Sequence, residues 1–221
     1  MRGRRRRPGG AEMVLAHRGN HTAHPENSLA ALLAARDVAD GFETDVRETA
    51  DGVLVLSHDP DAPDGLPIAS RSYEEVRDAW SGRGGLARLD SLLEAVDPGM
   101  FAFFEVKVGG VAGRVIGLAL PVFGGRLRIG GFDPAHLAEV PGDIRWLIVH
   151  GADEVPSELP GFAGIAARAD AYPFGLAVRE RAAWRADAAS ATALVADGVR
   201  FLISDDPARV RDALSPRSRR S

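Results

Sequence analysis

Side chains that can exchange protons or bind a cation are concentrated between Leu15 and Asp59. His17 follows the apolar run MVLA and His58 follows the apolar run VLVLS, while two acids lie between them in the run GFETDV. Short apolar runs are typical of buried strands, and the residues that follow them lie where the scaffold meets solvent. Ionisable groups that rigid elements hold at such positions are typical of an active site.

The spacing of the acids predicts that they share one site. Residues two apart in a β-strand face the same side, so Glu43 and Asp45 are expected to project together. The same holds for Glu105 and Lys107 in the later run EVK. Three neighbouring carboxylates raise one another's pKa unless a cation lies between them. Because the chain has no cysteine, these hard oxygen ligands predict one divalent cation, Mg²⁺ or Ca²⁺. The open alternative is that the acids are ordinary exposed charges at strand ends.

Lys107 is the single lysine in a chain whose other 26 basic residues are arginine. A compact ammonium group can act as a point charge on a phosphate oxygen where a planar guanidinium is too bulky. We therefore interpret Lys107 as a phosphate-binding candidate, with chance placement of a lone lysine as the alternative.

Apolar runs alternate with helix-compatible segments along the chain. Strands are predicted at 13–16, 41–46, 53–57, 100–106, 126–131 and 145–150, with weaker candidates at 167–172, 177–184 and 200–204. Helices are predicted at 29–38, 73–80, 90–96, 110–120, 134–140 and 188–196. Asn27 or Ser28 is expected to cap the first helix. Repeated strand–helix units predict an α/β fold, specifically a TIM-type (β/α)8 barrel.

Two short connections predict that this barrel is irregular and shortened. Only about six residues separate Asp45 from the next strand at Gly52 or Val53, whereas a helical crossover needs about a dozen residues or more. The two strands either form a hairpin or are joined by a return without a helix. The connection between the strand candidates at 167–172 and 177–184 likewise leaves no room for a full helix.

The length of 221 residues with 45% hydrophobic residues predicts one domain, over 13–214. The flanks 1–12 and 215–221 are arginine-rich and predict a basic disordered extension and a basic tail. Met13 precedes the first strand, which leaves open that residues 1–12 lie upstream of the natural start. No apolar run approaches the roughly 18 residues that cross a bilayer, and no signal-peptide pattern follows the first arginines. We expect a cytoplasmic protein without stable membrane insertion.

Charge is distributed unevenly along the chain. The net charge is −4, and the eight arginines near the two ends contribute +8, so the part between them carries −12. A protein that binds nucleic acid normally presents a basic face on its folded part. The acidic body therefore predicts a small-molecule ligand and no nucleic-acid partner. The sequence makes no prediction about the oligomeric state.

Five short motifs together resemble the glycerophosphodiester phosphodiesterase family. They are HRG at 17–19, PENS at 25–28, ETD at 43–45, DG with HD at 51–52 and 58–59, and EVK at 105–107. Weaker similarity to the family continues in the segments RLDSLLEAV, GGFDPAHL, AAWRAD and GVRFLISDDP. The order and spacing of the motifs make the resemblance specific, and it extends over nearly the whole chain after residue 13.

The resemblance implies a TIM-type barrel that needs a divalent cation and cleaves glycerophosphodiesters into sn-glycerol 3-phosphate and an alcohol. It implies attack on phosphorus by the neighbouring glycerol hydroxyl, giving a cyclic phosphate that water then opens. A bell-shaped pH profile follows if one histidine starts neutral and the other protonated. The implied roles are His17 and His58 as general acid and base; Glu43, Asp45 and Glu105 as metal ligands; Arg18 and Lys107 as phosphate ligands; and Asn27 and Trp184 as further substrate-binding residues.

Some positions depart from the family's pattern. Trp184 is followed by Arg185, Ala186 and Asp187 where the family usually has Thr-Val-Asn, and Gly131 replaces a serine. These departures are expected to line the far side of the mouth and predict altered substrate fit. A shortened segment at 172–177 predicts an opened wall that admits a head group larger or flatter than that of glycerophosphocholine.

Two other functions are compatible with the same motifs. One is action on lysophospholipids in the manner of phospholipase D enzymes, which an exposed apolar rim would favour. The other is a non-catalytic barrel that binds phosphorylated ligands or a partner protein, which predicts a missing histidine or metal ligand. The remaining histidines are interpreted as solvated, for His21 and His24, or structural, for His136 and His150.

Overall fold

Parallel strands pair edge to edge in this protein until the last strand meets the first. The computed structural model describes residues 12–156, 158–173 and 180–215, so nearly all of the predicted extension at 1–12 and of the predicted tail at 215–221 lies outside the described residues. Eight described strands follow one another in the order β1-β9-β8-β7-β6-β5-β4-β2, and β1 also pairs with β2. Because this last pairing closes the sheet, the predicted TIM-type barrel is confirmed.

The barrel strands are short. Their bounds are β1 Met13–Ala16, β2 Gly41–Glu48, β4 Phe101–Val106, β5 Leu127–Gly131, β6 Arg145–Val149, β7 Gly164–Arg168, β8 Glu180–Trp184 and β9 Phe201–Ser204. The additional strand β3, Leu54–Leu56, pairs antiparallel with β2, with Val46 opposite Leu56. The short connection after Asp45 therefore forms a hairpin, one of the two possibilities that the sequence left open.

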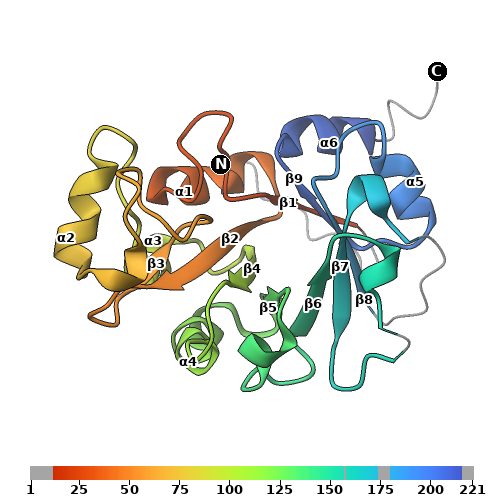
Figure 1. Ribbon diagram of the computed structural model, residues 1–221. Coiled ribbons are helices and arrows are strands. Elements are labelled where there is room, and N and C mark those ends of the chain that lie inside the picture. The colour runs from red at the N-terminus through yellow and green to blue at the C-terminus, as the bar shows by residue number, and fades with distance from the viewer. Residues whose placement is uncertain (1–11, 157, 174–179, 216–221) are drawn as a thin grey trace.

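Helices lie outside the barrel, and Figure 1 shows α1 and α6 on one side of it and α4 on another. The α-helices are α1 Leu29–Val38, α2 Tyr73–Arg77, α3 Leu89–Ala95, α4 Ala112–Phe123, α5 Ala191–Ala196 and α6 Pro207–Ala213. Short 3₁₀ helices cover Ile68–Ser70, Asp78–Trp80, Gly124–Arg126, Pro134–Leu137, Ala152–Glu154 and Ala169–Ala171. Within the described residues, no helix is long and apolar enough to cross a membrane.

Several predicted elements differ from the observed ones in the second half of the chain. The strand predicted at 167–172 is wrong, because β7 begins earlier and residues 169–171 form a 3₁₀ helix. β7 has the sequence GIAAR, and its glycine and alanines lack the β-branched side chains that mark a strand in a sequence. The helix predicted at 134–140 is a 3₁₀ helix of four residues, and α6 was not predicted.

The barrel interior is filled by aromatic rings. Trp146 packs edge-on against Phe103 and Phe201, with ring centroids 5.8 and 5.5 Å apart. Glycines make room for these rings: a Cβ on Gly164 would lie 2.8 Å from the Trp146 ring, and one on Gly130 would lie 2.7 Å from Phe103. This packed layer fills the barrel beneath the carboxyl ends of the strands, which leaves those ends to form the site.

A second hydrophobic layer lies between the barrel and its helices, and Phe42 on β2 is central to it. Its ring is fully buried and packs edge-on against Phe104 and Phe123, with centroids 6.0 Å away in both cases. We expect Phe42→Ala to lower the free energy of unfolding by about 3–5 kcal/mol, because the substitution removes a buried ring and leaves a cavity. Urea denaturation measures this loss. Leu118→Ala, at a side chain that is 46% exposed, serves as the control, and equal midpoints for the two variants would contradict this packing.

Candidate active site

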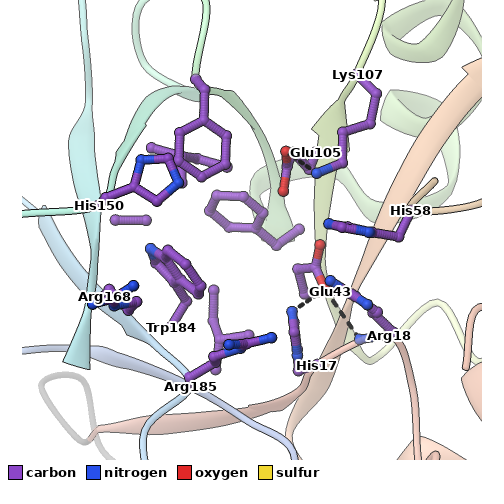
Figure 2. A pocket seen from close by; sticks show the side chains of 15 residues that line it. His17, Arg18, Glu43, His58, Glu105, Lys107, His150, Arg168, Trp184 and Arg185 are labelled. Carbon is purple, nitrogen blue, oxygen red and sulfur yellow. Dashed lines mark hydrogen bonds and ion pairs between the residues drawn. The ribbon is translucent and has the colours of Figure 1, made fainter. Parts of the chain in front are cut away.

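The ionisable residues singled out in the sequence meet at the carboxyl ends of the barrel strands. A cavity of about 280 Å³ opens there, and Figure 2 shows the side chains around it. Its two walls come largely from different halves of the chain. The polar wall is formed by His17, Arg18, Glu43, His58, Glu105 and Lys107, and the far wall by Phe103, Phe132, Ile148, His150, Ala166, Arg168, Trp184, Arg185 and Ile203.

Three carboxylates lie in the polar wall or directly beneath it. Glu43, Asp45 and Glu105 are buried, and each offers an oxygen within 4.8 Å of the others. Strand register causes this approach, because Asp45 on β2 lies directly opposite Glu105 on β4. Burial, followed by the charges of Asp45 and Glu105, raises the pKa of Glu43 well above its usual value. Burial and the charge of Asp45 raise the pKa of Glu105 to about 7.

This donor set fits a hard divalent cation. All three groups provide carboxylate oxygens, which are the ligands that Mg²⁺ and Ca²⁺ prefer. Burial, together with the repulsion between the acids, keeps the pKa values of Glu43 and Glu105 raised despite the neighbouring cations. We therefore consider Glu43, Asp45 and Glu105 the residues that would hold the ion.

Asp45 lies beneath the cavity and anchors both phosphate-binding candidates. Its Oδ1 is 3.1 Å from Lys107 Nζ, and its Oδ2 is 3.4 Å from Arg18 Nε. Burial alone would raise the pKa of Asp45, but the charges of Lys107 and Arg18 and a hydrogen bond from Asn27 lower it. Lys107 Nζ also lies 2.5 Å from Glu105, and the Arg18 guanidinium donates to Glu26.

Asn27 lies beneath the cavity, and its side chain contacts Asp45. Its backbone has φ of 55°, and its buried side-chain amide donates to Asp45 Oδ2 over 2.9 Å. Its carbonyl oxygen accepts a hydrogen bond from the Thr44 hydroxyl over 2.7 Å. The structure thus places this predicted substrate-binding residue against β2, outside the residues that line the cavity. Because Asn27 is engaged in this way, Ser28 alone caps α1, accepting a hydrogen bond from the backbone N–H of Ala31.

His17 is held by an acid that the sequence analysis did not single out. Its Nδ1 lies 2.5 Å from Asp205 Oδ1, and its Nε2 lies 3.8 Å from Glu43 on the cavity side. Burial, the largest effect, lowers the pKa of His17, and the charge of Arg18 adds to this against the opposing effect of Asp205. The hydrogen bond with His17 in turn lowers the pKa of Asp205. The available signal was an acid directly after the strand at 200–204, the same position that His17 occupies after β1.

His21 is not the freely solvated side chain that the sequence suggested. Its Nε2 lies 3.1 Å from Asp205 Oδ1, so two imidazoles share one carboxylate oxygen. His24 is exposed, as expected. His136 lies 3.5 Å from Asp133, away from the residues that line the cavity.

His58 reaches the cavity from the hairpin side. Its side chain is 39% exposed, and its Nδ1 lies 2.8 Å from Asp59 Oδ1. Arg47 donates from Nε and Nη2 to the backbone carbonyl oxygen of His58, over 3.1 and 2.6 Å, which fixes the segment after β3 to β2. Figure 2 shows the imidazoles of His58 and His17 on the same side of the cavity as Glu43.

The far wall is aromatic. The His150 ring stacks on Phe132 with centroids 4.5 Å apart, and both rings lie within about 6 Å of Trp184. The Trp184 indole N–H donates to the Val149 carbonyl oxygen, which fixes the ring in the wall. His150, interpreted from the sequence as structural, is therefore part of the cavity.

Of the positions that depart from the family's pattern, only Arg185 lines the cavity. Ala186 is buried in the core between the barrel and the helices. A Cβ on Gly131 would face the carbonyl oxygen of Val106 and the side chain of Leu137, so this position was wrongly expected at the mouth. The segment predicted to open a wall lies mostly outside the described residues.

Comparison with known proteins agrees with this architecture. The model of the glycerophosphoryl diester phosphodiesterase family matches residues 17–90. A glycerophosphodiester phosphodiesterase from Thermotoga maritima has a similar structure, with a TM-score of 0.76, 20% identity, and coverage of 91% of this chain and 97% of that one. A phosphodiesterase from Oleispira antarctica, solved with the product sn-glycerol-3-phosphate, has a TM-score of 0.75 at 21% identity, with coverage of 92% and 97%. Over residues 17–90 the chain thus matches the glycerophosphodiester phosphodiesterase family, and it shares the fold of solved proteins of that family.

Sequence relatives match over shorter segments. A probable glycerophosphodiester phosphodiesterase 1 of Mycobacterium tuberculosis is 55% identical over 51 residues, which is 23% of this chain and 19% of that protein. Glycerophosphodiester phosphodiesterase 1 of Bos taurus is 46% identical over 110 residues, 42% of this chain and 33% of that protein. The matched segments thus span about a fifth to a third of these relatives. The family match at 17–90 includes Glu43 and both catalytic candidates, His17 and His58, whereas the far wall lies beyond it.

The three carboxylates make cation binding pH-dependent. A carboxyl group must lose its proton to ligate a metal, so the pKa of about 7 for Glu105 predicts that affinity for Mg²⁺ or Ca²⁺ falls as pH decreases through 7. If one such proton must be lost before the cation binds, the Kd for the cation is about tenfold higher at pH 6 than at pH 8, which calorimetry can measure. Glu105→Gln should weaken binding at least about tenfold at pH 8. Asp37→Asn, on the exposed end of α1, should leave both results unchanged, and an equal loss in that variant would refute the site.

Proposed function

We propose that this chain is a metal-dependent phosphodiesterase that cleaves glycerophosphodiesters into sn-glycerol 3-phosphate and an alcohol. The observation that carries the proposal is the convergence of two histidines and three carboxylates on one cavity at the carboxyl ends of the barrel strands. The family match and the product bound to the Oleispira antarctica relative support the same substrate class. A cytoplasmic location and the choice between Mg²⁺ and Ca²⁺ stay predictions from the sequence.

His17 suits the role of general base. Burial lowers its pKa, which favours the neutral imidazole at neutral pH. Asp205 accepts the Nδ1–H, which leaves the lone pair of Nε2 toward the cavity. In this orientation Nε2 takes the proton from the glycerol hydroxyl as its oxygen bonds to phosphorus.

His58 then acts as the general acid. The bond between phosphorus and the alcohol oxygen breaks, and protonated His58 supplies the proton that the departing oxygen needs. The product of this step is a cyclic phosphate, which water opens with the two histidines in exchanged roles. Because one histidine must be neutral and the other protonated, activity is expected to pass through a maximum with pH.

Arg18 and Lys107 bind the phosphoryl oxygens. Both are anchored on Asp45, so their charges are fixed before the substrate arrives. A divalent cation held by Glu43, Asp45 and Glu105 would supply further neutralisation of charge on the same oxygens. Asn27 positions Asp45, and Trp184 forms the apolar surface against which the glycerol backbone packs.

The two alternative functions receive less support. Action on lysophospholipids would be favoured by an apolar rim, but among the described residues the exposed large apolar side chains, Leu66, Leu118 and Leu120, do not line the cavity. A non-catalytic barrel would lack a histidine or a carboxylate of the set, and all five are present around the cavity or beneath it.

The proposal is tested by release of glycerol 3-phosphate from glycerophosphocholine and glycerophosphoethanolamine. Activity should disappear with a chelator and return with excess Mg²⁺ or Ca²⁺. His17→Ala and His58→Ala should each lower kcat at least about 100-fold, because proton transfer by a positioned side chain contributes that much or more. His24→Ala, in the same loop as His17 but exposed, is the control. Hydrolysis that persists in the chelator or in His17→Ala would exclude the proposed mechanism.

Asp205→Asn should lower kcat by about 10²- to 10⁴-fold with little change in KM, because an amide no longer fixes the His17 tautomer. The matched control is Asp206→Asn, since the neighbouring Asp206 caps α6 by accepting from Arg209 and asparagine caps equally well. Steady-state kinetics on a glycerophosphodiester measure both variants. A parallel loss in the two variants would indicate damage to the β9–α6 connection in place of a role for Asp205.

A further inference from the structure

The basic side chains that line the cavity differ in whether they form an ion pair with a carboxylate of the same chain. All but one are paired with a carboxylate: Arg18 with Glu26, Lys107 with Glu105, Arg168 with Asp170, His17 with Asp205, His58 with Asp59 and His150 with Glu154. In the part of the chain that the structure describes, Arg185 has no carboxylate partner, and the stretches outside it contain no Asp or Glu. The charge of Arg185 is therefore available to a ligand.

The backbone directs Arg185 into the mouth of the cavity. This residue follows β8 with φ of 56°, a left-handed conformation that residues other than glycine rarely adopt. The next residue is fixed, because Ala186 is buried and its N–H donates to the Ile203 carbonyl oxygen over 2.9 Å. Figure 2 shows the Arg185 side chain extending from the Trp184 side toward His17. Such a conformation at a site often accompanies a functional constraint.

Arg185 lies at the rim, whereas the groups proposed to act on phosphorus lie deep. Arg185 is exposed, while His17, Glu43 and Glu105 are at most 8% exposed. A phosphodiester whose phosphorus lies against the deep groups must direct one of its two substituents toward the rim. Because the glycerol backbone is proposed to pack against Trp184 inside the cavity, the departing alcohol is the substituent that points toward the rim.

The geometry points to Arg185 as an anion-binding subsite for the head group, so that the preferred substrates are glycerophosphodiesters whose alcohol carries a carboxylate or a second phosphate. This inference rests on the proposed function and adds the substrate class to it. A guanidinium group binds either anion through paired N–H donors. The reacting phosphate is served by other cations, Arg18 and Lys107, so Arg185 discriminates among head groups.

Two pairs of substrates isolate the anion. Glycerophosphoserine differs from glycerophosphoethanolamine by one carboxylate, and glycerophosphoinositol 4-phosphate differs from glycerophosphoinositol by one phosphate. With the metal-loaded enzyme, kcat/KM should be about two- to fivefold higher for the anionic member of at least one pair, as expected for a partly exposed ion pair. The pair with the larger ratio identifies the anion, and 0.5 M salt should reduce that ratio.

Arg185→Gln should bring the ratio within each pair close to one, and Arg185→Lys should retain part of it. Arg36→Gln, with the same charge change on the exposed surface of α1, should keep the wild-type ratio. The inference would be overturned if the wild-type kcat/KM ratios were one. It would also be overturned if Arg185→Gln lowered kcat/KM equally for both members of a pair and so left the ratio unchanged. In both cases the proposed function stands.

If none of the four substrates is hydrolysed, the proposed function is contradicted, and a separate measurement then tests the role of Arg185. Calorimetric Kd values of the metal-loaded wild type and Arg185→Gln for the same four compounds then decide the inference. Tighter binding of the anionic member by the wild type alone supports it. Equal Kd values within both pairs, or the same preference in both proteins, overturn it.

Discussion

The site depends on the electrostatic compensation of three buried carboxylates. Removing ionised acids from water is costly, and placing them within 4.8 Å of one another adds repulsion. Within the described chain Arg18 and Lys107 offset part of this cost, and both contact Asp45. Three acids against these two bases leave an excess of negative charge, which a divalent cation can offset. The same compensation holds two phosphate-binding cations in place before any substrate is present.

Strand register produces the contacts that matter for the chemistry. Ala16 of β1 lies opposite Ser204 of β9, so the next residues, His17 and Asp205, leave neighbouring strands at the same level. Closure of the barrel between β1 and β9 therefore creates a histidine–aspartate pair from residues 188 positions apart. Asp45 and Glu105 are brought together in the same manner by β2 and β4. A parallel sheet places such ends at one edge, and closing the sheet turns that edge into a cavity.

The two walls of the cavity differ in chemical character and therefore in the functions that they suit. The polar wall comes from β1, β2, β3 and β4 and contains the groups suited to proton transfer and to binding phosphate or a cation. The far wall comes largely from β5, β6, β7 and β8 and consists of aromatic and apolar side chains with arginines at its edge. Part of the polar wall lies in the segment that matches the family, and the far wall lies outside it. Variation in the far wall can alter substrate choice without altering the groups that act on phosphorus.

The sequence by itself determined the barrel class and the residues of the polar wall. Its signals were local: residues two apart on a strand share a face, and polar residues directly after apolar runs lie at strand ends. Glu43, Asp45, Glu105, His17 and His58 all follow from such short-range rules. Local rules failed where strands lack β-branched residues, so β7 was misplaced, and they did not reveal that Asn27 contacts Asp45.

Only the tertiary structure decided which distant residues touch. The pairing of His17 with Asp205 depends on barrel closure, and the position of His150 in the cavity and the difference in burial between Arg185 and Ala186 depend on how the chain packs around the barrel. These contacts join residues far apart in the chain, and nothing in the spacing of a single sequence encodes them. The pairing of the last strand with the first completes the ring of strands, and only then does each strand end have a neighbour on both sides.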